Sequence, residues 1–258
     1  MQKLKITIIT ITYNSERTVR DTFESVRKQH YPNLEYLIID GGSTDGTLKI
    51  AEEYSDIITS IVSEPDKGIS DAMNKGIRRA TGDLIGIIHS DDMLAENALE
   101  RLAEEWDAAH DIYYGNCVMC TVDGKPIHIL RAETDLSGFQ YGITIVHPST
   151  FVTKIAYEKY GLFDITLKCA MDYDLLARFY FGGARFRYID AVLSIYRVGG
   201  TNMKLRKKTI DEVRDISICH GANPLKAHMI AWKKRLADRA RPVLRLLRIK
   251  SRRIQKLN

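Results

Sequence analysis

The sequence contains little cysteine, and its four cysteines show no spacing typical of a disulfide framework. Cys117 and Cys120 form one Cys-x-x-Cys pair inside the segment DIYYGNCVMCTVDGKPIHIL, which reads as strand, turn and strand. A single pair of this kind is weak evidence for zinc or redox chemistry. We therefore interpret both residues as reduced structural thiols, which suits a cytosolic compartment.

Long hydrophobic runs are also missing, since no stretch reaches the roughly 18 apolar residues that a membrane-spanning helix needs. The N-terminal segment MQKLKITIITITYN begins like a secretion signal, but its apolar run is short and no small-residue cleavage site follows. We expect a first β-strand there. The sequence shows no linker rich in Pro, Gly or Ser and no repeat, so its 258 residues fit one large α/β domain with a small appendage.

The first 90 residues alternate between apolar runs and amphipathic segments with helical spacing. This alternation predicts βαβ units and a mainly parallel sheet flanked by helices. The predicted strands span residues 5–13, 34–40, 57–64 and 84–92. We expect Asp45 and Ser70 to cap the second and third helices. After residue 110 we expect a hairpin, further strands and helices, and beyond Gly200 mostly helix.

Each of the four predicted strands ends in polar residues. These ends are Tyr13-Asn14, Asp40-Gly41-Gly42-Ser43, Glu64-Pro65-Asp66-Lys67-Gly68 and His89-Ser90-Asp91-Asp92. The carboxyl ends of parallel strands meet at one edge of a sheet, and ligands bind in open α/β folds at that edge. One such group alone is typical of a turn or helix cap, but four on one edge indicate a binding site.

The residue types on this edge predict a ligand that contains phosphate. Glycines allow backbone amides to approach phosphate oxygens closely. The GxGxxG and Walker lysine motifs are absent, which argues against a dinucleotide or NTPase site. Asp91 and Asp92 would repel a diphosphate unless a divalent cation lay between them. We therefore expect a nucleoside diphosphate bridged to the protein by Mn²⁺ or Mg²⁺.

Three segments, in order, resemble family 2 glycosyltransferases of the GT-A fold. They are TITYNSERTVRDTFESVRKQHYPNLEYLIIDGGSTDGT, EPDKGISDAMNKGIRRATGDLIGIIHSDD and MDYDLLARF. The resemblance runs from about Lys5 to Gly200 and is to bacterial enzymes that assemble surface polysaccharides. It implies a Rossmann-like α/β fold. It also implies inverting transfer of a hexose from a nucleotide diphosphate donor, usually UDP-linked, to a saccharide or lipid-linked saccharide acceptor.

The resemblance also implies roles for individual residues. Asp172 matches the general base of the family, Asp92 the metal ligand, and Asp91 a carboxylate near the ribose. The nucleotide-binding residues that it implies are Thr12, Tyr13, Asn14, Asp40, Gly42, Ser43, Lys67, Asp71, Asn74 and Asp91. The chemistry agrees, because inversion needs one base for the acceptor hydroxyl and one metal to offset charge on the departing diphosphate.

Several of these residues have an alternative interpretation. Asp172 is also placed to be the N-cap of its own helix, and Asp174 would point elsewhere on that helix. His147 would line the acceptor side, approach the metal, or simply be packed. His89 supports the metal loop rather than binding the ion. Arg197, with Gly199-Gly200, would form a mobile flap over the diphosphate.

Gly41 replaces an aspartate that is common in the family and often contacts uracil. The base would then be held by Asp40 alone or by other groups such as Asp66 or Lys67.

The charge is distributed unevenly along the chain. Residues 226–258 contain 12 Lys/Arg and one acidic residue, whereas residues 1–225 contain 26 Lys/Arg and 32 Asp/Glu. Met229, Trp232 and Leu236 share one helical face of this basic tail, which indicates an amphipathic helix that lies on an anionic membrane surface. The alternatives are packing on the body or on a sister subunit of a homodimer. Nucleic acid binding is disfavoured by the acidic body.

We therefore predict a GT-A glycosyltransferase domain over residues 1–222, with a nucleotide-binding half of about 1–110 and an acceptor half of about 111–222. Residues 223–258 form a basic helical tail. The protein would work in the cytoplasm, peripheral to the inner face of the plasma membrane. The rival functions are a sugar-phosphate nucleotidylyltransferase and a non-catalytic subunit that binds a sugar nucleotide.

Overall fold

The first half of the sheet is parallel, as predicted. The computed structural model describes residues 4–142, 145–199 and 205–254, with side chains as far as Arg239. Strands β1 (Ile6–Thr12), β2 (Leu34–Asp40), β3 (Ser60–Ser63) and β4 (Leu84–Ile87) pair in parallel in the order β3-β2-β1-β4. Thr12 is in register with Asp40, and Asp40 with Ser63, so these strands end at one edge. The fourth strand ends at Ile87 and does not continue to residue 92.

The second half of the sheet is mixed, so the prediction of a mainly parallel sheet holds only for the first half. Strand β8 (Thr150–Thr153) runs antiparallel to β4 and to β6 (Ile112–Cys120). Strand β9 (Phe186–Arg197) is parallel to β6 and antiparallel to the short β5 (Met93–Leu94). Strand β7 (Pro126–Leu130) forms the predicted hairpin with β6. Of these antiparallel pairs, β6 and β7 are joined by a tight turn, which needs no helical crossover.

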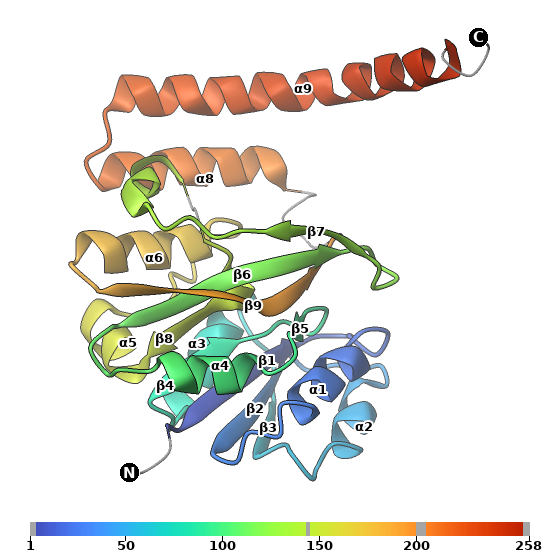
Figure 1. Ribbon diagram of the computed structural model, residues 1–258, viewed down its shortest axis with the longest axis vertical. Helices are drawn as coiled ribbons and strands as arrows, with labels where there is room; N and C mark the ends of the chain where they lie inside the picture. Colours follow the sequence, from blue (N-terminus) through green and yellow to red (C-terminus); the bar gives the residue numbers. More distant parts are fainter. Residues whose placement is uncertain (1–3, 143–144, 200–204, 255–258) are drawn as a thin grey trace.

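Helices cover both faces of the sheet (Figure 1). Helices α1 (Val19–Arg27), α2 (Thr47–Glu52) and α4 (Ala98–Glu105) pack on one face, and α3 (Ile69–Arg79), α5 (Lys154–Tyr160) and α6 (Met171–Phe181) pack on the other. Neighbouring residues of β1 show why the strands are apolar throughout. Ile8 belongs to the core under α1, and Ile9 to the core under α3. A strand covered on both faces needs apolar side chains on both.

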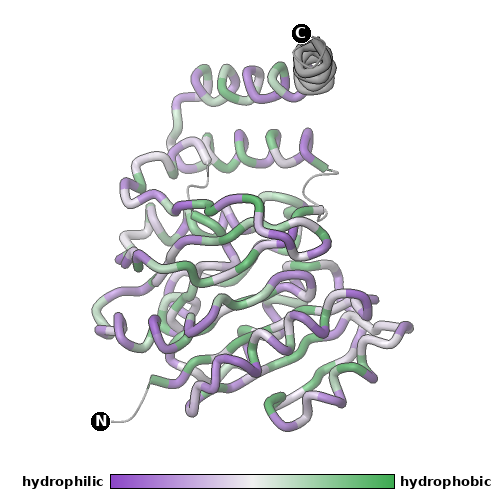
Figure 2. The backbone as a smooth tube through the Cα atoms, turned by 45° about the vertical axis from the view of Figure 1, so that its right-hand side comes forward, coloured by the Kyte–Doolittle hydropathy of each residue, from purple (hydrophilic) through white to green (hydrophobic). Residues whose placement is uncertain are grey.

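Two helices continue outward beyond α6. Helix α8 (Arg206–Cys219) packs on α6, and the long α9 (Pro224–Ile254) packs on α8 (Figures 1 and 2). Short 3-10 helices η1 (Leu136–Tyr141) and η2 (His147–Ser149) complete the described elements. Within the described ranges, every helix is too short or too polar to cross a bilayer.

The two predicted helix caps are wrong in detail. Helix α2 has Gly46 at its N-cap, while the Asp45 carboxylate accepts hydrogen bonds from the Thr47 N–H and hydroxyl at 3.0 and 2.5 Å. Helix α3 has Gly68 at its N-cap, and Ser70 is a buried residue of its first turn. In α2 the Asp45 carboxylate accepts the N–H of Thr47, the first helical residue. In α3 the Asp71 carboxylate reaches back to the N–H of Lys67, which lies before the N-cap.

Candidate active site

The ends of β1 and β2 form what we call the nucleoside rim, residues 12–14 and 40–43. Its centre is the Asp40 carboxylate, which is fully buried. It accepts five hydrogen bonds, from the hydroxyls of Thr12, Ser43 and Ser63 at 2.5–2.8 Å and from the N–H groups of Gly42 and Ser43 at 3.0 and 2.8 Å. Burial alone would raise the pKa of Asp40, but these donors lower it below its usual value. Asp40 therefore holds the rim in shape.

Asn14 connects the rim to the neighbouring loops. Its φ of +48° lies in the left-handed region that asparagine tolerates better than most residues. Its N–H donates to Ser43 Oγ at 2.8 Å, and its side-chain oxygen accepts the Thr44 N–H at 2.9 Å. Next to it, Ser15 Oγ and Ser90 Oγ lie 2.8 Å apart. This last contact ties the rim to the loop that carries Asp91 and Asp92.

A side chain at position 41 would have to displace the Asp66 carboxylate. A Cβ atom there would lie 2.5 Å from Asp66 Oδ2 and 3.3 Å from the ring of Tyr13. The Asp66 carboxylate therefore fills the space that a side chain at position 41 would take. Its other oxygen accepts the Gly68 N–H at 2.7 Å, while the Tyr13 ring beside it is 64% exposed. One carboxylate and one aromatic ring thus flank Gly41 on the open edge.

Three residues predicted in the donor pocket differ in what they do. The Lys67 side chain is exposed, whereas the Asp71 carboxylate accepts the Lys67 N–H at 3.0 Å and so shapes the loop before α3. Asn74 is buried, and its amide exchanges two hydrogen bonds with the backbone of Phe163 at 2.8 and 2.9 Å. Asn74 thus fastens α3 to the loop between α5 and α6, and its side chain is taken up by that contact.

The turn after β4 brings together His89, Asp91 and Asp92, which we call the metal corner. One ligand atom of each residue lies within 4.8 Å of the others. Asp92 is buried and accepts the Arg197 N–H at 3.0 Å. Burial and the charge of Asp91 raise the pKa of Asp92 to about 8. A divalent cation would compensate this buried negative charge, so the donor set fits Mn²⁺ or Mg²⁺.

His89 is the residue that sequence reasoning assigned only a supporting role. Its Nε2 is buried without a hydrogen-bond partner among the described residues. Burial lowers the pKa of His89, and so does the charge of His147, while the charges of Asp172 and Asp91 oppose the shift. A neutral imidazole with a free nitrogen is a competent metal ligand. The signal that could have found it is its place two residues before Asp91 on the same strand end.

His147 lies beside His89, with ring centroids 5.9 Å apart. It is buried, packs edge-on against Phe163 at 5.6 Å, and has no partner for Nδ1 among the described residues. The structure therefore gives His147 both features that the sequence left open, a packed ring and a position at the metal corner.

Asp172 projects from the start of α6 toward the same place. The N-cap of α6 is Ala170, so Asp172 is not the cap residue. Asp172 is half-buried, and its charge acts on His89 and, together with Asp91 and Asp92, on the half-buried Tyr196. Burial and these carboxylates raise the pKa of Tyr196. A loop, a helix start and a strand that lie far apart in the sequence thus meet around one point.

Asp174 is engaged elsewhere, as expected. Its carboxylate pairs with Arg178 at 3.0 Å, one turn along the same helix. This pairing leaves Asp172 as the carboxylate of the helix start that faces the metal corner.

The structure places Arg197, the predicted flap residue, at the end of a strand. Arg197 is the last residue of β9 and is buried, and its guanidinium pairs with Asp21 of α1 at 2.8 Å. Its backbone pairs with Cys120 of β6, and its N–H donates to Asp92. Gly200, the other end of the expected flap, lies outside the described residues.

The two thiols of the Cys-x-x-Cys pair are buried and free, as predicted. Burial raises the pKa of both Cys117 and Cys120, so they stay protonated and unreactive at neutral pH.

The chain matches known proteins over most of its length. The profile described as Glycosyl transferase family 2 matches residues 7–175. An uncharacterized glycosyltransferase of Rickettsia typhi is 28% identical over 67% of this chain, and the chain spans 58% of that relative. An uncharacterized glycosyltransferase of Mycobacterium tuberculosis is 31% identical over 67% of this chain and 68% of its own length. TuaG of Bacillus subtilis, which is named for teichuronic acid biosynthesis, is 35% identical over 38% of this chain and 40% of its own length.

Two solved structures share the fold. S. aureus TarS 1-349 in complex with UDP-GlcNAc has a TM-score of 0.65 at 19% identity, over 88% of this chain and 70% of that one. The mannosyltransferase PcManGT from Pyrobaculum calidifontis, in complex with GDP-Man and Mn²⁺, has a TM-score of 0.66 at 19% identity, over 90% of this chain and 70% of that one. The chain belongs to glycosyl transferase family 2 and has the GT-A fold.

Proposed function

We propose that the chain transfers a hexose from a nucleotide diphosphate donor to a saccharide or lipid-linked saccharide during assembly of a bacterial surface polysaccharide. The observation that carries this proposal is the convergence of Asp91, Asp92 and Asp172 around Tyr196 and His89. Family membership makes transfer the reaction class, and the named role of TuaG supports the pathway class. Membership of this family also argues against the rival function of a sugar-phosphate nucleotidylyltransferase.

The nucleoside would lie against the rim. In this proposal Asp40 and Thr12 shape the rim, and Tyr13, Asn14, Gly42 and Ser43 offer the surface. Asp66 would replace the aspartate missing at Gly41, because its carboxylate fills that space. A carboxylate there accepts from the N3–H of uracil or the N1–H of guanine, and the exposed Tyr13 ring offers a stacking face. We propose uridine, as in the UDP-GlcNAc complex of TarS. Preferential binding of a guanosine nucleotide would instead favour a guanosine donor, as in the GDP-Man complex of PcManGT.

The diphosphate would lie between the rim and the metal corner. Asp92 and Asp91, with His89, would hold a Mn²⁺ or Mg²⁺ ion, which when bound offsets the charge on the departing diphosphate. The exposed Lys67 side chain, on the loop before α3, is placed to add a positive charge. His147 would line the acceptor side of the corner.

Asp172 is our proposed base. A half-buried carboxylate at a helix start that makes no capping contact is free to accept the proton of an acceptor hydroxyl. As that oxygen attacks the anomeric carbon from the face opposite the diphosphate, the bond to the leaving oxygen breaks and the configuration inverts. The reaction needs no covalent intermediate on the protein.

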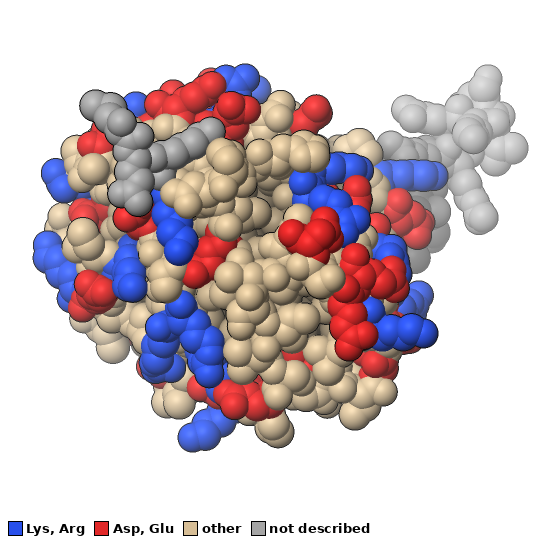
Figure 3. All heavy atoms as spheres, turned by 90° about the horizontal axis from the view of Figure 1, so that it is seen from below, with Lys and Arg blue, Asp and Glu red and all other residues tan. Residues whose placement is uncertain are grey.

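The acceptor would reach the site at a membrane surface. On α9, Leu225, Met229, Trp232 and Leu236 are 82%, 48%, 59% and 42% exposed on one helical face, within the basic tail. We propose that this face lies on the inner, anionic face of the plasma membrane and that residues 223–258 form the tail unit. Elsewhere the charges are interspersed, and Figure 3 shows acidic and basic side chains mixed on the opposite end of the molecule. Homodimer formation through the tail is the rival use of this face.

The base assignment is tested by Asp172→Asn, with Asp174→Asn as the matched control on the same helix. Release of nucleoside diphosphate is measured with the best donor from a panel of nucleotide sugars. We expect Asp172→Asn to lose at least about 1,000-fold in kcat while UDP and Mn²⁺ still bind. The control should keep activity within about 10-fold. Retained turnover in Asp172→Asn would favour a non-catalytic binding subunit or a different base.

The membrane assignment is tested by replacing Met229 and Trp232 with serine. We expect the native chain to sediment with vesicles that contain anionic lipid and the double variant to remain in the supernatant. Equal sedimentation of both proteins would show that this helical face is not the anchor.

A further inference from the structure

Helix α8 holds the segment that leads into Asp172 with a single carboxylate. The N–H groups of Lys168, Cys169 and Ala170 all donate to Glu212, at 3.1, 2.9 and 2.8 Å. Glu212 lies more than 40 residues further along the chain, and its side chain is only 12% exposed. Three successive backbone N–H groups form a concave site for an anion, and here the anion is a side chain of the protein itself.

The start of α6 cannot supply this contact from its own sequence. Its N-cap residue is Ala170, which has no side-chain acceptor, and no side-chain cap bond is made there. Without Glu212 the N–H groups of Cys169 and Ala170, both buried, would lose their acceptor. Buried donors without partners are costly, so this segment depends on α8 for its conformation.

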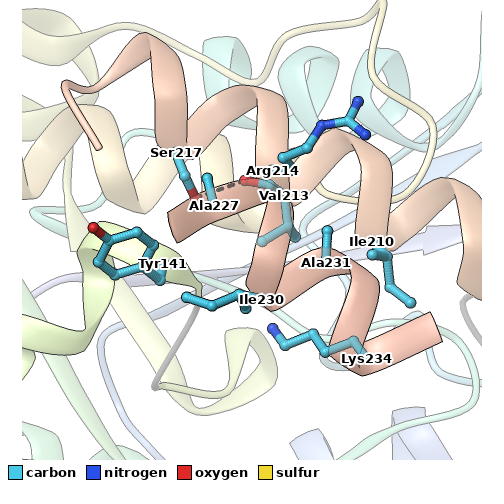
Figure 4. Close-up of a pocket in the computed structure, with 9 residues that line it drawn as sticks. All are labelled: Tyr141, Ile210, Val213, Arg214, Ser217, Ala227, Ile230, Ala231 and Lys234. Atoms are coloured by element: carbon cyan, nitrogen blue, oxygen red, sulfur yellow. Dashed lines mark hydrogen bonds between the residues drawn. The ribbon is translucent and has the colours of Figure 1, made fainter. Parts of the chain in front are cut away.

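A second contact from α8 lies on the other side of Asp172. The Tyr173 hydroxyl lies 3.0 Å from Ser217 Oγ of α8 and donates to the Phe139 carbonyl at 2.6 Å. Glu212 therefore holds the residues before Asp172, and Ser217 contacts the residue after it. Ser217 also lines, with Val213 of α8, a small pocket against Ala227, Ile230 and Ala231 of α9 (Figure 4). Helix α8 thus lies between the tail and the proposed base.

We propose that Glu212 is a positioning residue that fixes the direction in which the Asp172 carboxylate enters the site. This inference rests on the proposed role of Asp172 as the base. Glu212 contacts the 168–170 segment and Lys208, and its helix α8 lies on the side of α6 away from strands β1–β4 (Figure 1). Its loss should therefore affect the chemical step and not nucleotide binding. A small displacement of a catalytic group is enough to lower a rate strongly.

The test compares Glu212→Ala, Glu212→Gln and the control Asp215→Asn. Asp215 is a carboxylate on the same helix whose side chain is 61% exposed and pairs with its neighbour Arg214. We expect Glu212→Ala to lower kcat about 10- to 100-fold, with the affinity for UDP and Mn²⁺ unchanged within about 2-fold. Glu212→Gln keeps an acceptor oxygen at the same reach, so it should recover part of the rate. Asp215→Asn should match the native protein.

Two further readouts separate positioning from a general loss of structure. Amide hydrogen exchange at residues 168–170 should become faster in Glu212→Gln, which keeps the length of the side chain, and not in Asp215→Asn. In an Asp172→Asn background, Glu212→Ala should cause no additional loss of rate, because both changes act through one group.

The outcomes are distinct. Unchanged kcat in Glu212→Ala, or unchanged exchange at 168–170 in Glu212→Gln, would overturn the inference. So would a loss of UDP affinity that matches the loss of rate, or an additive loss with Asp172→Asn. If Glu212→Ala does not fold, the exchange and kcat of Glu212→Gln decide. Full activity of Asp172→Asn would instead contradict the proposed base, whatever the exchange at 168–170 shows.

Discussion

At the end of β2 the buried Asp40 carboxylate accepts five hydrogen bonds and has a lowered pKa. At the end of β4 the equally buried Asp92 accepts the backbone N–H of Arg197, faces the charge of Asp91, and has a pKa raised to about 8. The two residues lie on one sheet edge and have the same chemistry. They differ in the number of hydrogen bonds that the protein donates to each carboxylate.

This difference separates a group that maintains shape from a group that awaits a ligand. A carboxylate saturated by protein donors has no free lone pair for a nucleotide, so Asp40 contributes by holding Gly42 and Ser43 in place. A buried carboxylate with a raised pKa stores unfavourable electrostatic energy, which a bound cation relieves. In the proposed function, the nucleoside rim would therefore be preformed, whereas the metal corner would be completed by a bound cation.

The largest expected effect on stability is that of Asp40→Ala. Removing the carboxylate leaves the buried donors of the rim without an acceptor, so the free energy of unfolding should fall by about 3 kcal/mol in urea unfolding. Because the pKa of Asp40 is lowered by folding, its contribution is present at neutral pH and is lost as the pH falls below about 4. Asp123→Ala, at an exposed turn position, is the control. A loss under about 0.5 kcal/mol would remove the distinction drawn for Asp40.

Without metal, Asp92→Asn is expected to raise the free energy of unfolding at high pH, whereas Asp40→Ala lowers it. Folding raises the pKa of Asp92 to about 8, so the native state binds a proton that the unfolded chain has released above about pH 4. The stability of the metal-free native protein should therefore decrease as the pH rises from 4 toward 8. Above pH 8, Asp92→Asn should be more stable than the native protein by on the order of 2 kcal/mol.

Thermal unfolding at pH 6 and pH 9 in a chelator checks this second prediction. Asparagine keeps the acceptor for the Arg197 N–H, so the variant should fold normally. The exposed Asp123→Asn change should leave the pH dependence as it is. If Asp92→Asn is less stable than the native protein at pH 9, the protein stabilises the ionised carboxylate of Asp92 as well as it stabilises that of Asp40.

A smaller effect is expected at Gly41. Gly41→Asp would place its Cβ against Asp66 Oδ2 and push a second carboxylate into the same space. We expect about a 10-fold loss of UDP affinity, or about 1.4 kcal/mol, with little change in stability because the edge is open. Combining Gly41→Asp with Asp66→Gly should restore binding, because it returns one carboxylate to the site. Tighter UDP binding by Gly41→Asp alone would contradict the idea that Asp66 fills this place.

The first half of the fold could be predicted because its strands and helices follow from local patterns of apolar residues. The apolar runs that end in Tyr13, Asp40 and Asp92 are typical of strands, and alternation with helices predicts parallel pairing. The parallel pairing of β1 to β4 is confirmed. The mixed pairing of β6, β8 and β9 could not be read in the same way, because antiparallel and parallel partners leave the same apolar pattern in a short strand.

The sequence predicts which residues gather at the site better than it predicts the role of each one. The motif around Asp91 and Asp92 points to the edge where both now lie. The roles of Asp40 and Asn74 depend on which hydrogen-bond partners surround each side chain, and those partners come from segments up to 89 residues away. The buried place of Arg197 follows from pairing of β9 with β6 and β5, which no local pattern reveals.

The central claim is that the metal corner is the part of this edge that a ligand completes. Titration of Mn²⁺ in the presence of UDP, followed by calorimetry at pH 8 on the native protein and on Asp92→Asn, tests it most directly. We predict saturable Mn²⁺ binding to the native protein, weakened at least about 10-fold in Asp92→Asn. Equal Mn²⁺ affinity in the two proteins would contradict the claim.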